Sequence, residues 1–157
     1  MLQETIELEK LRQELEKVEQ ENGNLSDYLD RGRPNAEQEQ QTLKQMAQNE
    51  QRSVELRAQL RDQLVTLRAH KPKVIEEWVQ WHNEICQRIL AESEGTKARS
   101  ARDLVARETL ANWDKVLKGE EDFVSINGYY LADYYSKEVQ QGVGQPEGKK
   151  WWKFWGS

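Results

Sequence analysis

The sequence predicts an all-α protein, and three observations lead to this prediction. Charged residues make up 32% and hydrophobic residues 36% of the 157 residues, a balance too polar to fill a deep globular core. Glycine (9) and proline (3) are scarce, so long stretches are free of helix breakers. Apolar residues recur at spacings of three and four, the period of a helix that buries one seam. We expect an N-terminal coiled-coil arm, a long second helix and a compact C-terminal helical bundle with a flexible aromatic-basic tail.

Residues 1–31 carry a heptad pattern that is typical of a coiled coil. The seam residues are Leu8, Leu11, Leu15, Val18, Asn22, Leu25 and Leu29. Asn22 falls at a core position, where it would fix register and strand number at some cost in stability. We interpret this seam as an oligomerisation surface, most simply of a homodimer with parallel or antiparallel strands. The alternative is that the same residues pack against another helix of the same chain.

Residues 35–70 form the predicted second helix. Pro34 disfavours helical geometry at Arg33, and Asn35 with Gln38 has the spacing of a helix N-cap and its third residue. The expected inner stripe of this helix is apolar at both ends and polar in the middle. It comprises Leu43, Met46, Glu50, Ser53, Arg57, Leu60, Leu64 and Leu67.

Residues 73–141 are predicted to form a helical bundle that starts after Pro72. Two neighbouring apolar rows give its first helix a broad hydrophobic face. These rows are Val74, Trp78, Trp81, Ile85 and Ile89, and Ile75, Val79, His82, Cys86 and Leu90. A further helix is expected over about 96–117, closed by Gly119. The tyrosine-rich residues 122–141 form either a closing helix or a hairpin at Asn127-Gly128.

Residues 142–148 have the composition of a linker, and residues 149–157 form an aromatic-basic tail. The candidate binding residues of the tail are Lys149, Lys150, Trp151, Trp152, Lys153, Phe154 and Trp155. Tryptophan favours membrane interfaces, and lysine is attracted to anionic lipid. Tryptophan also anchors protein–protein contacts. The tail is therefore expected to bind an anionic membrane surface or a protein partner, with folding back onto its own domain as the third alternative.

The sequence contains no complete catalytic or metal-binding pattern. His82 and Cys86 lie four residues apart on the predicted helix, but a zinc site needs three or four such ligands. We interpret Cys86 as a small hydrophobic residue and His82 as a polar edge of the tryptophan cluster. The sequence carries no phosphate-binding glycine loop and no hydrolase signature. We expect a protein that is not an enzyme and needs no cofactor and no metal.

A basic cluster gives the main alternative function. Its candidate phosphate-binding residues are Lys97, Arg99, Arg102 and Arg107. Neighbouring acidic residues such as Asp103 and Glu108 would cancel much of their field, so an ordinary solvated surface is favoured over a nucleic-acid contact. The formal net charge of −5 also argues against general binding of nucleic acid.

Together these patterns predict a homo-oligomeric adaptor or scaffold that reaches a protein partner or a membrane surface through its tail. The alternatives are a small helical subunit of a nucleoprotein assembly and a cochaperone-like dimer whose long helices act on another protein. The first residues lack a basic start and apolar core of a signal peptide, and no window is apolar enough to span a membrane. We therefore expect a cytoplasmic protein, in part peripheral at a membrane.

Overall fold

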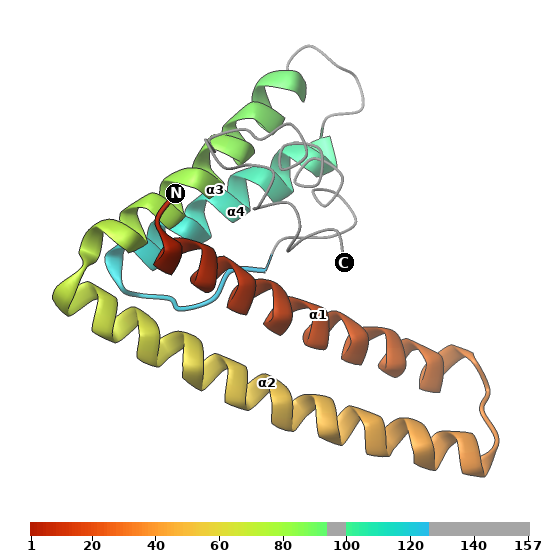
Figure 1. The fold of residues 1–157 in the computed structure, drawn as a ribbon. Helices are drawn as coiled ribbons and strands as arrows, with labels where there is room; N and C mark the ends of the chain where they lie inside the picture. The colour runs from red at the N-terminus through yellow and green to blue at the C-terminus, as the bar shows by residue number, and fades with distance from the viewer. Residues whose placement is uncertain (94–99, 126–157) are drawn as a thin grey trace.

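The computed structural model describes residues 1–93 and 100–125, and this part of the chain contains four helices and no strand (Figure 1). The helices are α1 (Gln3–Arg31), α2 (Ala36–His70), α3 (Pro72–Ser93) and α4 (Ser100–Lys118). The prediction of an all-α fold is confirmed. Residues 126–157 lie outside the described part, so the closing helix or hairpin, the linker and the tail stay predictions.

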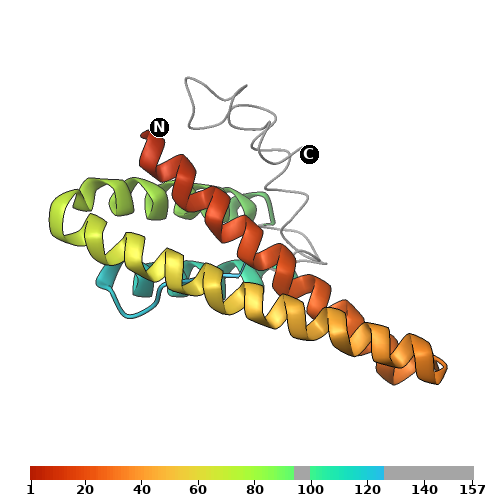
Figure 2. The same cartoon turned by 60° about the horizontal axis from the view of Figure 1, so that its bottom comes forward.

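Helices α1 and α2 form a long antiparallel hairpin (Figures 1 and 2). α1 ends where the Gly32 N–H donates to the Tyr28 carbonyl at 2.8 Å, and Arg33 then turns the chain with a φ of 50°. The predicted cap of α2 is confirmed and is a complete capping box. The Asn35 side chain accepts from the Gln38 N–H at 2.8 Å, and the Asn35 N–H donates to the Gln38 side chain at 3.0 Å.

Helices α3 and α4 pack against each other and against the part of the hairpin near the N-terminus (Figure 1). Pro72 is the first residue of α3 rather than a spacer before it, because a proline at this position lacks only an N–H that would have no helical partner. The start of α1 is fastened to α3 by Glu77. Its carboxylate accepts from the Leu2 N–H at 3.0 Å and from the Thr5 hydroxyl at 2.6 Å.

One hydrophobic core joins all four helices. We call the part of the molecule that is built around the residues of this core the body. Trp78 of α3 and Trp113 of α4 are fully buried at its centre, with ring centroids 4.8 Å apart in an edge-to-face arrangement. The buried hydrophobic residues of the core are Leu8, Leu11, Leu15, Leu56, Leu60, Leu64, Val74, Ile75, Trp78, Val79, Trp81, Ile85, Ile89, Ala106, Trp113, Val116 and Val124.

The distal half of the hairpin projects beyond α3 and α4 (Figures 1 and 2). We call this part, residues 18–31 and 36–53, the arm. Its interior combines the half-buried Leu25, Leu29 and Met46 with polar side chains. Asn22 donates to the Met46 carbonyl at 3.2 Å, and Thr42 and Asn49 are buried against α1. The arm therefore has weaker apolar packing than the body, whose side of the same hairpin is filled by leucines.

The stripe by which α2 faces α1 differs from the predicted one in its arm and middle sections. Leu43 is 49% exposed and Arg57 is 45% exposed, whereas their neighbours Thr42 and Leu56 are buried. Asn49 likewise takes the inner position that was assigned to Glu50. The reason is that α2 carries apolar residues on two faces. Leu43, the first residue of the predicted stripe, belongs to the exposed face, so Leu43, Glu50 and Arg57 each fall one residue after a buried position.

After α4 the chain runs back along α2 to α1 (Figure 1). Gly119 ends α4 with a φ of 81°, and a side chain on it would meet the Arg68 side chain at 3.3 Å. The Arg68 guanidinium donates to the Val116 carbonyl at 2.8 Å and so caps the end of α4. Phe123 then lies under the Arg57 guanidinium, 5.0 Å from ring centroid to carbon.

Replacing the two asparagines inside the arm by leucine, as Asn22→Leu with Asn49→Leu, should stabilise the protein. The Asn22 Oδ1 and Asn49 Nδ2 atoms are buried and have no hydrogen-bond partner among the described residues. Each buried unpaired group costs about 1–3 kcal/mol, whereas the hydrogen bond from Asn22 to Met46 and the one from Gln45 to Asn49 are each worth about 0.5–1.5 kcal/mol and are lost. The free energy of unfolding in urea should therefore rise by about 1–3 kcal/mol in the double variant. Asn24→Leu, on the exposed face of α1, is the control and should change little. A less stable double variant would contradict the description of the arm interior.

Candidate functional site

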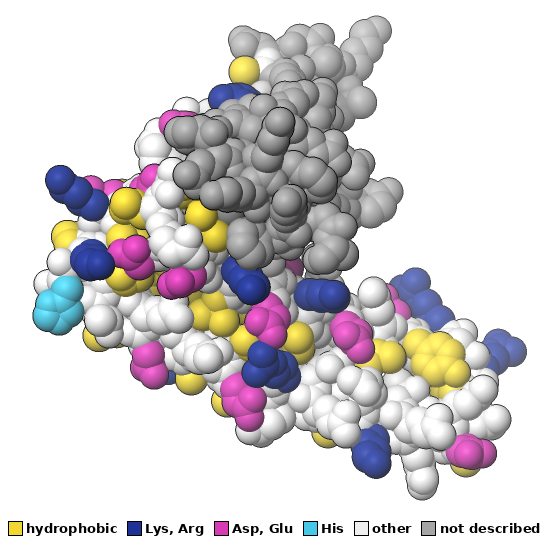
Figure 3. All heavy atoms as spheres, viewed as in Figure 1, with side chains coloured by type: hydrophobic (Ala, Val, Ile, Leu, Met, Phe, Trp, Pro, Cys, Tyr) yellow, Lys and Arg dark blue, Asp and Glu magenta, His cyan; other side chains and the backbone are white. Residues whose placement is uncertain are grey.

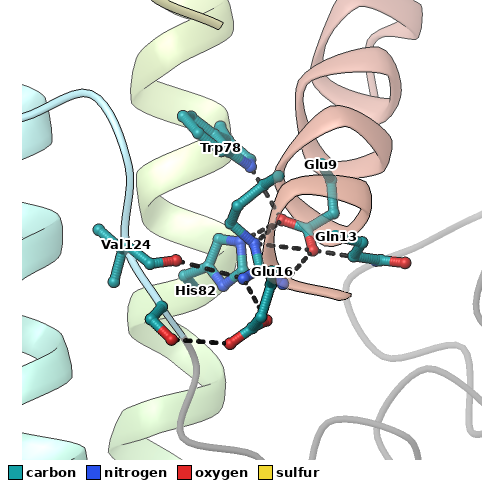
Figure 4. A network of polar contacts seen from close by, with 8 residues as sticks. Glu9, Gln13, Glu16, Trp78, His82 and Val124 are labelled. Carbon is teal, nitrogen blue, oxygen red and sulfur yellow. Dashed lines mark hydrogen bonds and ion pairs between the residues drawn. The ribbon is translucent and has the colours of Figure 1, made fainter. Parts of the chain in front are cut away.

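The most distinctive polar feature of the body is a buried charged cluster between α1, α3 and residues 119–125, the returning segment that leads from α4 back to α1 (Figure 4). Its central members are Glu9 and Arg12 of α1 and His82 of α3, which are 1%, 1% and 0% exposed. Charged side chains are almost never fully buried unless they are paired. The cluster therefore has to satisfy its own charges and hydrogen bonds.

Glu9 is the centre of the cluster. Its Oε1 atom accepts from the Trp78 indole N–H at 3.0 Å and lies 2.6 Å from the His82 Nε2. Its Oε2 atom accepts from Arg12 Nη2 at 2.8 Å and from the Gln13 amide at 3.0 Å. Burial alone would raise the pKa of Glu9, but the charge of Arg12 and the hydrogen bonds hold that pKa well below its usual range. Glu9 is therefore a carboxylate inside the core.

Arg12 connects the cluster to the returning segment. Its Nη1 atom donates to Glu16 at 2.8 Å and to the Val124 carbonyl at 3.2 Å. Glu16 in turn accepts from the Ser125 hydroxyl at 3.0 Å. Burial alone would lower the pKa of Arg12, but the two carboxylates hold the pKa above its usual range. One guanidinium thus fixes the position where residues 119–125 meet α1.

His82 is enclosed by aromatic rings. Its imidazole stacks on Trp113 with centroids 3.8 Å apart, and Trp81 lies edge-on at 4.8 Å. Burial lowers the pKa of His82 to about 4, against the opposing effect of the Glu9 charge, so the ring is neutral at physiological pH. A neutral imidazole can donate to Glu9 only with its proton on Nε2. Figure 4 shows this contact at the centre of the cluster.

The cluster has the arrangement of a structural centre rather than of a reaction site. Its charged atoms are closed off from solvent and already occupied by protein partners, so a substrate would find no free side to approach. Breaking a buried pair by removing one partner costs several kcal/mol because the remaining charge is left uncompensated. The cluster therefore specifies how α1, α3 and residues 119–125 fit together.

Sequence reasoning missed Glu9 and Arg12. It placed His82 at the edge of the tryptophan cluster, whereas the ring lies inside that cluster. The available signal was the spacing of Glu9, Arg12 and Glu16, which puts three charges of alternating sign on one side of α1. That spacing usually marks a solvated face, and only the packing of α3 against it makes the face internal.

The predicted oligomerisation seam divides between the body and the arm. Leu8, Leu11 and Leu15 are 0%, 9% and 0% exposed in the core of the same chain, the intramolecular alternative left open by the heptad pattern. Val18 is half-buried against that core. Asn22, Leu25 and Leu29 are half-buried in the arm. The body half of this seam is thus occupied by the protein's own helices, because α2 and α3 supply the apolar surface that a second chain was expected to provide.

The other predicted site residues fall mostly outside the described part. Arg107 lies on the exposed side of α4, and Arg102 belongs to the first turn of that helix. Lys97, Arg99 and the tail residues 149–155 lie outside the described residues. On the face shown in Figure 3, cationic and anionic side chains are interspersed, and neither sign forms an extended patch among the coloured atoms.

An open hollow of about 390 Å³ lies between the start of α1 and the end of α2. It is lined by Glu4, Glu7, Asp62, Gln63, Thr66 and Leu67. Glu4 at its rim pairs with Lys71 at 3.0 Å. Within the described residues, no group of three or more His, Cys, Asp and Glu side chains is arranged to hold a metal ion. None of the helices in residues 1–93 and 100–125 combines the length and apolar character needed to cross a membrane.

Comparisons with protein-family models, with curated proteins and with solved structures find no match to this chain. The residues and geometry of the chain itself are thus the basis for any functional proposal.

Removing the charge at the centre of the cluster by Glu9→Gln should destabilise the protein by about 3–5 kcal/mol in urea unfolding. The amide keeps the shape of the side chain but brings an N–H₂ group against donors, and it leaves Glu16 as the one carboxylate that Arg12 contacts. Glu14→Gln is the matched control, because Glu14 pairs with Arg52 on the surface, where both side chains are 47% exposed. That control should cost less than about 1 kcal/mol. Equal losses in the two variants would show that the cluster is not the centre of the fold.

His82 should make the protein less stable as the pH falls. Its folded-state pKa of about 4 lies below the ordinary 6.5, so the unfolded chain takes up the proton first. The contribution is complete above about pH 6.5, is lost progressively toward about pH 4, and amounts to roughly 3 kcal/mol. The His82→Gln variant keeps an amide donor for Glu9 but cannot titrate. Between about pH 7 and pH 4.5, urea unfolding should therefore show a smaller loss for this variant than for the parent protein. Identical losses would rule out the assignment of His82 as a buried neutral group.

Proposed function

We propose that this protein is a non-enzymatic adaptor. It is a helical scaffold whose residues 149–155 either recruit a protein partner or attach the scaffold to an anionic membrane surface. The observation that carries the proposal is the burial of the charged cluster in the body. Its conspicuous polar groups, Glu9, Arg12 and His82, are at most 1% exposed. Binding is then a task for the outer surfaces and for the chain beyond residue 125.

The composition of the tail supports this proposal. Its aromatic residues and its lysines Lys149, Lys150 and Lys153 follow a Gly- and Pro-containing stretch over residues 142–148. Aromatic rings supply large apolar contact area with a polar edge, and lysines add attraction to anionic headgroups. We place the protein in the cytoplasm, in part at a membrane surface.

A second candidate function follows from the arm. A pair of long helices that projects from a body resembles the lever of the cochaperone-like alternative, and Tyr28 at 38% and Leu43 at 49% are exposed on it. This candidate function predicts a stoichiometric complex with another protein. Formation of that complex should not depend on lipid or nucleic acid. Loss of that complex in Tyr28→Asp would place the contact on the arm.

The tail proposal is tested by flotation with vesicles of phosphatidylcholine and phosphatidylserine. The intact chain should float, and a chain that ends at Gly148 should not. A variant with Trp151, Trp152 and Trp155 changed to alanine keeps the length and charge of the tail and should also fail to float. Vesicles of phosphatidylcholine alone are the control for the lysines, and binding to them should be weaker.

Either of two results would redirect the proposal. If the intact chain does not float, membrane attachment is excluded, and the same three proteins should be compared in pull-downs for a protein partner. If the shortened chain floats as well as the intact one, the tail is not the binding element in either form of the proposal.

A further inference from the structure

α2 carries a second apolar stripe on the side that faces away from α1. Its residues are all exposed and recur at alternating intervals of four and seven: Leu43, Ala47, Val54, Ala58, Val65 and Ala69. The three larger side chains are 49%, 59% and 59% exposed. Eleven residues make just over three full turns of an α-helix, so this repeat keeps the stripe nearly straight along α2.

The stripe is distinct from the surface that α2 presents to its own chain. The inward side of α2 holds the buried Thr42, Asn49, Leu56, Leu60 and Leu64. At 100° per residue, the outer stripe lies roughly 135° around the helix from these residues. Single exposed apolar residues are normal on a protein surface, but a regular row along most of a 35-residue helix is not accounted for by chance exposure.

The stripe is complementary to itself when two copies run antiparallel. Aligning Leu43 of one copy with Ala69 of the other also aligns Ala47 with Val65 and Val54 with Ala58. Each larger side chain then faces an alanine, which allows two helices to approach closely and interdigitate. A parallel alignment would instead place Leu43, Val54 and Val65 against their own copies and leave the alanines facing each other across a gap.

Charges beside the stripe agree with the same alignment. Glu50 and Arg61 lie on one flank, and residues on the same flank meet in an antiparallel pair of helices with two-fold symmetry. The alignment brings Glu50 of each copy within one residue of Arg61 of the other, and Arg61 also pairs with Asp122 of its own chain at 3.2 Å. Arg57 and Glu55 lie nearest the two-fold axis. Both are already paired within the chain, Arg57 with Glu19 and Glu55 with Arg52.

We propose that the outer stripe of α2 is the homodimer interface of this protein, with two α2 helices packed antiparallel. The stripe is about 40 Å long and about 10–12 Å wide, so a dimer would bury on the order of 1,000 Å², whereas stable complexes bury roughly 1,200–2,000 Å². The dimer is therefore reversible and forms with rising protein concentration. The proposed dimer does not depend on the adaptor function. Only its consequence, the display of two tails on one particle, rests on that proposed function.

The interface is tested by sedimentation equilibrium of the full chain over a range of concentrations. The parent protein should approach twice the mass of one chain, and Val54→Glu should stay monomeric, because the change buries two uncompensated carboxylates near the two-fold axis. Leu104→Glu is the matched control: Leu104 is 68% exposed on α4, away from the stripe, and this variant should dimerise like the parent. Circular dichroism would establish that both variants are folded.

The antiparallel alignment is tested by oxidation of cysteine variants. Leu43→Cys and Ala69→Cys should form a disulfide-linked pair when mixed, and neither should link to itself, because antiparallel copies hold identical positions about 40 Å apart. Cys86, which is buried, is present in every sample alike. A parent protein that is monomeric throughout, a Val54→Glu variant that dimerises like the parent, or a Leu43→Cys variant that links to itself would each overturn the proposal. None of these outcomes depends on whether the tail binds lipid or protein.

Discussion

The body depends on the burial of one carboxylate. Glu9 enters the core from α1, where an unpaired charge would be too costly to keep, so the donors around it have to be in place for the fold to be stable. Those donors come from α1 itself and from Trp78 and His82 of α3. Arg12 extends the requirement to the Val124 carbonyl. The cluster thus makes the packing of α3 and the path of residues 119–125 conditional on each other.

The hairpin of α1 and α2 serves two different purposes along its length. In the body, leucines of both helices face α3 and α4 and are shielded from water. In the arm, the polar Asn22, Thr42 and Asn49 lie between the two helices beside half-buried leucines, and among the described residues the two helices pack only on each other. Local opening costs least where few apolar contacts are lost. The arm is therefore the part of the described chain in which motion or rearrangement on binding meets the least resistance.

A helix with two apolar faces has one face left over after the monomer has folded. In α2 the inner face is used by α1, and the outer stripe of alanines, valines and one leucine stays in contact with water. The oligomerisation predicted from the heptads of α1 and the dimerisation proposed for α2 share a physical reason, because both assign a partner to an apolar row of a helix. In the structure, the row on α1 is covered by the protein's own helices in the body, whereas the outer row of α2 is exposed.

The sequence by itself determined the helices, the capping box at Asn35, the turn at Gly119 and the broad apolar face of α3, because these depend on periodicity and on residues close together in the chain. Tertiary structure alone decided that Leu8, Leu11 and Leu15 face helices of their own chain. A heptad records that a helix has an apolar partner but not which one. It also decided the inner face of α2 and the cluster of Glu9, Arg12 and His82. Residues 9 and 82 meet only because α3 folds back onto α1, and no local spacing encodes a contact across 73 residues.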